Sequence, residues 1–193
     1  HNVAGVNELV TYGADKVYLV EDPRLGHYQA AGYGKVLCDL IAERKPQVVL
    51  YGATAIGRDL APTVASAAKC GLTADCTDLQ IGDHTPPGSQ VTHKNLLLQI
   101  RPAFGGNIIA TIVNFDRWPQ MATVREGVMA MAEPDASRAG EVIRVKAALD
   151  GVKLPLTLRG SIWKETMQIV KPRTRQQYEF AAALAEKRYW AEG

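Results

Sequence analysis

The spacing of apolar residues divides the first part of the chain into alternating helix-like and strand-like segments. Three stretches repeat apolar residues every three or four positions, as one face of an α-helix does, and two short apolar runs lie between them. This order of strands and helices predicts a parallel sheet with right-handed crossovers. The expected helices are Val3–Tyr12, Tyr28–Arg44 and Arg58–Lys69, and the expected strands are Lys16–Val20 and Gln47–Tyr51.

Proline and glycine mark the ends of these segments. The second helix should stop before Pro46, because the residue preceding a proline disfavours the helical conformation. Pro62 is expected within the first turn of the third helix, where its missing N–H would have no partner in any case. Gly71 is a suitable terminator for that helix.

After Gly71 the pattern changes to strands separated by turns. The segment Gly82–Gln90 (GDHTPPGSQ) is rich in turn-forming residues and is predicted to form a mobile hairpin loop. We therefore expect a mixed sheet, parallel at its centre and antiparallel at an edge. The expected strands are Thr77–Ile81, Thr92–Arg101, Asn107–Val113, Met121–Val124 and Glu141–Ala147.

The last forty residues have a different pattern. Trp163–Val170 and Arg175–Trp190 have helical character, and the second segment is rich in Ala and Glu with an apolar stripe. We therefore expect a domain at residues 1–150 and a helical C-terminal appendage at residues 151–193 whose role has no assignment. The start at His1 indicates a domain whose first strand and helix are missing.

Composition excludes several classes of protein. No apolar run approaches the roughly 20 residues that span a bilayer, and a net charge of +2 from interspersed charges argues against nucleic-acid binding. The 3 cysteines and 4 histidines lack metal-ligand spacing. Reduced thiols and the absence of a signal-peptide pattern predict a cytoplasmic protein without a metal site.

The loop after the second strand is the first candidate site. Small residues at a strand end allow a phosphate or a neighbouring backbone to approach closely, and Arg58 adds a positive charge at a helix start. Alternatively, the glycines only permit a tight turn and Asp59 complements the helix dipole. The sequence supports both interpretations equally, and it matches neither a P-loop nor a G-x-G-x-x-G motif. The candidate residues are Gly52, Ala53, Thr54, Gly57 and Arg58.

Two arginines and the turn Gly105–Asn107 form the second candidate site. Arg101 and Arg125 each stand at a strand end, a position that suits an anionic or electron-accepting group. The alternative, which the sequence alone favours, is an exposed arginine in a surface ion pair. Asp75 and Asp78 flank Cys76, but no nearby histidine completes a nucleophile and base, so Cys76 is interpreted as a packed residue.

Five motifs between Val6 and Val145 occur in an order that resembles the N-terminal domain of the alpha subunit of electron transfer flavoprotein. Their wording resembles the branch from anaerobic bacteria and archaea, which includes electron-bifurcating members. The motifs are VYLVEDP (17–23), GATAIGRDLAP (52–62), GLTADCT (71–77), RPAFGGNIIATI (101–112) and PQMATVREGVM (119–129).

The resemblance implies an α/β fold with three layers and a mixed, mainly parallel sheet of the adenine-nucleotide-hydrolase-like class. It also implies a heterodimer with a beta subunit, and a redox partner such as a dehydrogenase or a quinone- or ferredoxin-linked protein. FAD would be held mainly by the partner subunit or by the family's FAD domain, whose motifs this chain lacks. NADH or AMP are further candidate ligands at the interface.

Resemblance also assigns the candidate residues. It places Arg125 of the MATVR motif near a second flavin in the beta subunit, and the segment Gly52–Arg58 on the side where a nicotinamide dinucleotide or the beta chain approaches. We thus expect an electron-transfer component, not a stand-alone enzyme, that supports FAD-mediated electron transfer or NADH-dependent bifurcation. The alternative is a redox-inactive nucleotide-binding or scaffolding module. The expected cofactor-binding residues are Arg125, Thr123, Gly52, Ala53, Thr54, Gly57, Arg58 and Arg101.

Overall fold

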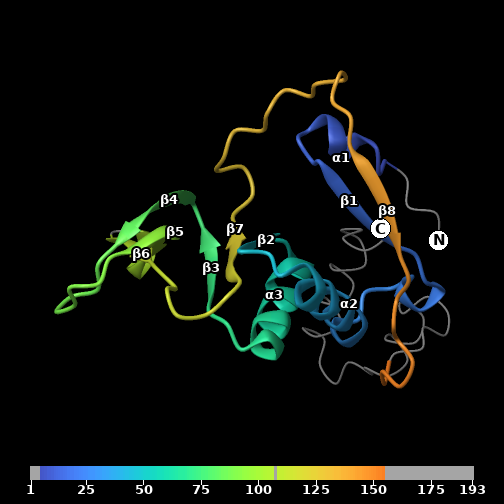
Figure 1. The fold of residues 1–193 in the computed structure, drawn as a ribbon, viewed down its shortest axis with the longest axis horizontal. Coiled ribbons are helices and arrows are strands. Elements are labelled where there is room, and N and C mark those ends of the chain that lie inside the picture. The colour runs from blue at the N-terminus through green and yellow to red at the C-terminus, as the bar shows by residue number, and fades with distance from the viewer. Residues whose placement is uncertain (1–4, 107, 155–193) are drawn as a thin grey trace, which may run out of the picture. The chain divides into compact units, whose positions relative to one another are not determined.

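Helices and strands follow each other along the chain in nearly the predicted order (Figure 1). The computed structural model describes residues 5–106 and 108–154, which belong to one unit that ends at Leu154. The predicted helical appendage at residues 151–193 falls almost wholly outside the described residues. The elements are α1 (Glu8–Thr11), β1 (Lys16–Val20), η1 (Pro23–Leu25), α2 (Ala30–Arg44), β2 (Val48–Gly52), α3 (Ala55–Ala68), β3 (Leu72–Cys76), β4 (Asp78–His84), β5 (His93–Ala103), η2 (Phe104–Gly106), β6 (Ile108–Ile112), β7 (Gln120–Val124) and β8 (Glu141–Val145).

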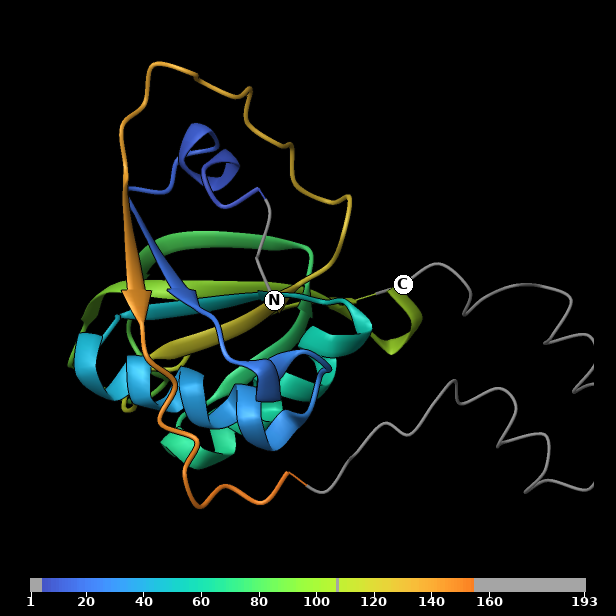
Figure 2. The ribbon, with the colours of Figure 1, turned by 90° about the vertical axis from the view of Figure 1, so that its right-hand side faces the viewer.

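The strands form parallel and antiparallel sheets, which confirms the α/β class with mixed strand directions. Strand β7 lies between β2 and β3 and is parallel to both, and β1 pairs in parallel with β8. The remaining strands form an antiparallel sheet in the order β4-β5-β6. Figure 2 shows α2 and α3 together on one side of the β2-β7-β3 strands.

The described strands form three hydrogen-bonded sheets, whereas the sequence predicted a single mixed sheet. The chain passes from β3 into β4 through Thr77, whose N–H donates to the carbonyl of Ile100 in β5 at 2.8 Å. The change of partner follows an irregularity in β3, where the pairing register with β7 shifts and Asp75 adopts a φ of 63°. A bulge of this kind bends a strand and increases its twist.

The main core lies between α3 and the central strand β7. Val64 and Met121 are fully buried, and Leu60 and Ala65 are nearly so. Partly buried side chains of α2 pack around this cluster, among them Tyr33, Leu37 and Ile41. The apolar stripe predicted for the second helix therefore faces the core. Among the described residues, no helix combines the length and the apolar character needed to cross a membrane.

Two predictions about α3 and β3 were wrong. Pro62 lies in the interior of α3 and not in its first turn, because the helix begins at Ala55. Its start is fixed by Thr54, whose Oγ1 accepts a hydrogen bond from the N–H of Gly57 at 3.0 Å. The strand β3, Leu72–Cys76, was not predicted, although its residues LTADC alternate between apolar and polar; the expected strand in this region began only at Thr77.

We expect Met121→Ala to lower the free energy of unfolding by about 2–5 kcal/mol, because it leaves a cavity beside Val64 that the core cannot fill. Urea unfolding of the wild type and the variant measures the difference. Met131→Ala is the matched control, because that side chain is 78% exposed and its loss should change stability by less than about 0.5 kcal/mol. Equal effects of the two substitutions would contradict the assignment of the core.

Candidate functional site

The candidate site lies at the carboxyl ends of three parallel strands. In the pairing of β2 and β7, Gly52 stands opposite Val124, and in the pairing of β3 and β7, Cys76 stands opposite the same residue. The segments that follow β2 and β7, and the irregular end of β3, therefore meet at one edge of the sheet. This edge is where open α/β sheets bind ligands.

Backbone contacts hold the loop between β2 and α3 against this edge. The N–H of Ala53 donates to the carbonyl of Val124 at 2.7 Å, and Nε of Arg58 donates to the carbonyl of Ala53, also at 2.7 Å. A Cβ atom at Gly57 would lie 1.9 Å from the carbonyl oxygen of Gly52. Glycine at position 57 is thus required by a close backbone approach.

Asp75 brings the two predicted candidate sites together. Its Oδ1 accepts hydrogen bonds from Nη2 of Arg58 at 3.0 Å and from Nε of Arg125 at 3.2 Å, and its Oδ2 accepts one from Nη2 of Arg125. The backbone N–H of Asp75 donates to Oγ1 of Thr123 at 2.8 Å. A single carboxylate therefore joins a residue of α3 to the residue that follows β7.

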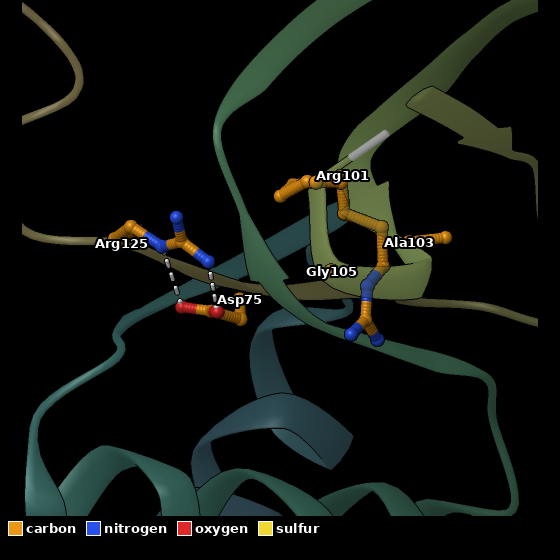
Figure 3. Close-up of a pocket in the computed structure, with 7 residues that line it drawn as sticks. Asp75, Arg101, Ala103, Gly105 and Arg125 are labelled. Carbon is orange, nitrogen blue, oxygen red and sulfur yellow. Dashed lines mark hydrogen bonds and ion pairs between the residues drawn. The ribbon is translucent and has the colours of Figure 1, made fainter. Parts of the chain in front are cut away.

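A cavity of about 420 Å³ opens beside this ion pair. Figure 3 shows the guanidinium of Arg125 against the carboxylate of Asp75, with Arg101 extending separately from β5. Within residues 5–106 and 108–154, the guanidinium of Arg101 makes no hydrogen bond or ion pair, while its backbone pairs with Ala110 of β6. The lining residues are Asp75, Arg101, Pro102, Ala103, Gly105, Gly106 and Arg125.

The electrostatics of the site keep both partners of the ion pair charged. The hydrogen bonds from Arg125 lower the pKa of Asp75, and the charges of Arg58 and Arg101 act in the same direction. In turn, the carboxylate raises the pKa of Arg125. Three guanidinium groups around one carboxylate leave the site positive, so it can attract an anionic group.

The structure brings together most, but not all, of the predicted site residues. Arg58 and Arg125 bind the carboxylate of Asp75, and Arg101 acts on it through its charge. The carbonyl of Ala53 accepts a hydrogen bond from Nε of Arg58. The side chain of Thr54 serves as the N-cap of α3. Thr123 is 1% exposed, and its hydroxyl accepts from the backbone of Asp75.

Sequence reasoning missed Asp75 as a member of the site. An aspartate between two strand-like runs has no motif of its own, and its importance comes from two arginines that are distant in the sequence. The one available signal was its residue type. Asp tolerates the left-handed backbone conformation better than most residues do, and an aspartate within a strand-like run can therefore mark an irregularity in the strand.

Comparison of the sequence with known proteins identifies the family. The Electron transfer flavoprotein domain family matches residues 2–150. The chain belongs to the electron transfer flavoprotein family. The resemblance inferred from the sequence motifs is therefore confirmed.

Members of the electron transfer flavoprotein family with similar sequences come from several anaerobes. Electron transfer flavoprotein subunit alpha of Thermoanaerobacterium thermosaccharolyticum is 47% identical over 171 residues, which cover 88% of this chain and 48% of the relative. The subunit alpha of Megasphaera elsdenii is 50% identical over 142 residues, or 74% of this chain and 39% of the relative.

A third relative carries a more specific name. Lactate dehydrogenase (NAD(+),ferredoxin) subunit LctC of Acetobacterium woodii is 46% identical over 127 residues, which cover 66% of this chain and 28% of the relative. The chain spans about half the length, or less, of these curated relatives.

The contact at Gly57 makes a direct test of the loop. Gly57→Ala should destabilise the chain by roughly 1–3 kcal/mol or more, because the new methyl group collides with the carbonyl of Gly52. Gly52→Ala is the control, because a Cβ there meets only Cγ2 of Thr54 at an ordinary 3.6 Å. Urea unfolding should show a much larger loss for position 57, and the reverse order would disprove this loop geometry.

The ion pair predicts a pH dependence of stability. The pKa of Asp75 lies below its usual value of 3.8 in the folded chain, so its stabilising effect is complete above that value and is lost as the pH falls through the folded-state pKa. Wild type should therefore be more stable than Asp75→Asn at pH 7, and the difference in the free energy of unfolding should shrink at pH 3.

Urea unfolding at both pH values measures this difference. Asp116→Asn is the control, because within the described residues its carboxylate contacts no arginine. A difference between wild type and Asp75→Asn that stays constant from pH 7 to pH 3 would rule out the carboxylate as its source.

Proposed function

We propose that this chain is the base domain of an electron transfer flavoprotein alpha subunit and supports FAD-mediated electron transfer together with a beta subunit. The observation that carries this proposal is the cavity lined by Arg101 and Arg125, with Arg58 bound to the same carboxylate as Arg125. Membership of the family supports it further.

The residues at the cavity fit the electron-rich edge of a flavin. FAD, when bound, accepts and releases electrons, and its reduced ring carries negative charge. Among the described contacts, Nη1 of Arg125 is not used by Asp75 and is free to donate a hydrogen bond. A fixed cation that is already oriented stabilises developing charge without a further reorganisation cost.

The shape of the cavity also suits a group supplied by another chain. Gly105 and Gly106 have positive φ values of 72° and 92°, and a Cβ at either position would meet no atom within 4 Å. This part of the lining therefore has open space in front of bare backbone. A ring or a backbone from a partner can approach it closely.

The beta subunit is the proposed source of that group. The strand-end site has donors but no enclosing wall of its own, which supports a flavin held mainly by the partner with Arg125 facing it. The cofactor-facing residues that we propose are Arg125, Arg101 and Arg58. The carbonyl of Ala53 holds the side chain of Arg58, and the hydroxyl of Thr123 holds the backbone of Asp75, which binds Arg58 and Arg125. The loop Gly52–Arg58 is the proposed contact for NADH, AMP or the beta chain.

The names of two relatives support the finer proposal of bifurcation with a further redox partner. LctC is named as a subunit of an NAD(+),ferredoxin lactate dehydrogenase. A 41% identical protein of Anaerotignum propionicum is named Acryloyl-CoA reductase electron transfer subunit beta. We propose that this chain likewise acts with a dehydrogenase and with NADH or a ferredoxin.

The rival function is a redox-inactive module that binds a nucleotide or only supports other domains. Counting flavins in the complex purified with its beta subunit separates the two functions. Bound flavin supports electron transfer. A complex that binds AMP but never flavin would favour the rival.

Arg125→Ala should make the midpoint potential of the flavin in the complex more negative, because the reduced ring loses a charged hydrogen-bond donor. A hydrogen bond to a charged group contributes about 1.5–3 kcal/mol, which for a two-electron couple is roughly 30–60 mV. Spectroelectrochemical titration of the flavin-loaded complex measures the potential.

Arg138→Ala is the matched control for this titration. Arg138 is also exposed and also paired with an aspartate, Asp15, but that pair lies between the start of β1 and the segment before β8. Arg138→Ala should leave the midpoint potential of the flavin unchanged. If Arg125→Ala also leaves the potential unchanged while the flavin stays bound, the proposed role of Arg125 is wrong.

A further inference from the structure

Asp75 makes contacts that a single surface ion pair would not require. It binds Arg58, in the first turn of α3, and Arg125, directly after β7, through the same carboxylate. In the described contacts each guanidinium uses Nε and Nη2, so each keeps Nη1 free. The carboxylate thus fixes the direction of two donors and leaves one nitrogen of each for another partner.

The backbone of Asp75 is held in a conformation that most residues avoid. Its φ of 63° lies in the left-handed region, at the point where the pairing of β3 with β7 is interrupted. The hydroxyl of Thr123, itself buried, accepts the N–H of Asp75 and keeps it in this position. Strained residues fixed by their surroundings are concentrated at functional sites.

Stability alone does not account for this arrangement. The side chains of Arg58 and Arg125 are 55% and 43% exposed, and exposed ion pairs contribute little to folding. The carboxylate also has an electrostatic consequence. Asp75 is the one anionic residue among the residues that line the cavity, and Arg101 and Arg125 are the two cationic ones. Its negative charge therefore lowers the attraction of the cavity for any other anion.

We propose that Asp75 is a positioning residue that holds Arg58 and Arg125 side by side and sets how strongly the cavity stabilises negative charge on the flavin. This inference rests on the proposed function, because it concerns the same cavity. Arg125 then meets the flavin ring through Nη1, whose direction is fixed because the carboxylate holds Nε and Nη2. The carboxylate also limits the positive charge that the ring experiences.

The positioning role is tested without reference to the flavin potential. Asp75→Gly removes the carboxylate, and glycine adopts a φ of 63° without strain, so the bond to Thr123 can remain. In the complex labelled with ¹⁵N at arginine Nε, the Nε–H of Arg125 should exchange with water at least about tenfold faster than in wild type. The Nε–H of Arg24 is the internal control, because it donates to the carboxylate of Asp22 and not to that of Asp75.

The electrostatic role is tested with Asp75→Asn, which keeps a side chain of nearly the same shape and removes the charge. At a fixed ambient potential, the ratio of reduced to oxidised flavin should rise about three- to tenfold, because one negative charge near the ring is lost. Asp78→Asn is the matched control. It removes an equal charge nearby in the sequence, but the carboxylate of Asp78 bonds only Leu79 and Gln80 among the described residues.

The background variant Arg125→Ala separates the outcomes. Asp75→Asn should still raise the reduced fraction there, because the negative charge of Asp75 acts on the ring whether or not Arg125 is present. The loss of this effect in the Arg125→Ala background, an effect equal to that of Asp78→Asn, a fall in the reduced fraction, or unchanged exchange of Arg125 overturns the inference. If exchange rises but neither Arg125→Ala nor Asp75→Asn changes the flavin ratio, the positioning role stands and the proposed function fails.

Discussion

The buried central strand β7 is the constraint on which the rest of the structure depends. It pairs in parallel with β2 on one side and β3 on the other, and Gln120, Met121, Ala122 and Thr123 are all buried. At its start, the side chain of Gln120 accepts the N–H of Leu97 at 2.9 Å and so ties the parallel strands to β5 of the antiparallel sheet. At its end, the backbone of Val124 and Arg125 bonds the loop after β2 and the end of β3.

This arrangement explains why chemistry accumulates at one edge. Parallel strands place their carboxyl ends together, and each of the three strands here ends in a segment with a polar side chain. Thr123 belongs to the strand but serves the site, because its hydroxyl holds the backbone of Asp75. A buried residue of the central strand therefore also sets the position of the carboxylate that holds the arginines.

Periodicity in the sequence was sufficient to predict α2, most of α3, the strands β1 and β2 and the parallel arrangement, because these depend on apolar faces that a local pattern records. The boundaries that failed depend on single side chains: the start of α3 is set by Thr54, and β3 is broken by Asp75. Arg125 directly follows β7 as predicted, whereas Arg101 lies within β5, which continues to Ala103. The common partner of Arg58 and Arg125 was not predicted, because contacts over 17 and 50 residues leave no local pattern.

The sharing of one carboxylate by two arginines has a consequence for how related sequences can diverge. Replacing Asp75 leaves two guanidinium groups without their shared acceptor, and replacing either arginine removes one of the two cations that the carboxylate holds. Compensation then requires a second substitution at a site far away in the gene. These three positions should accordingly be inherited as a block, and lineages that have abandoned one of them should have altered the others as well.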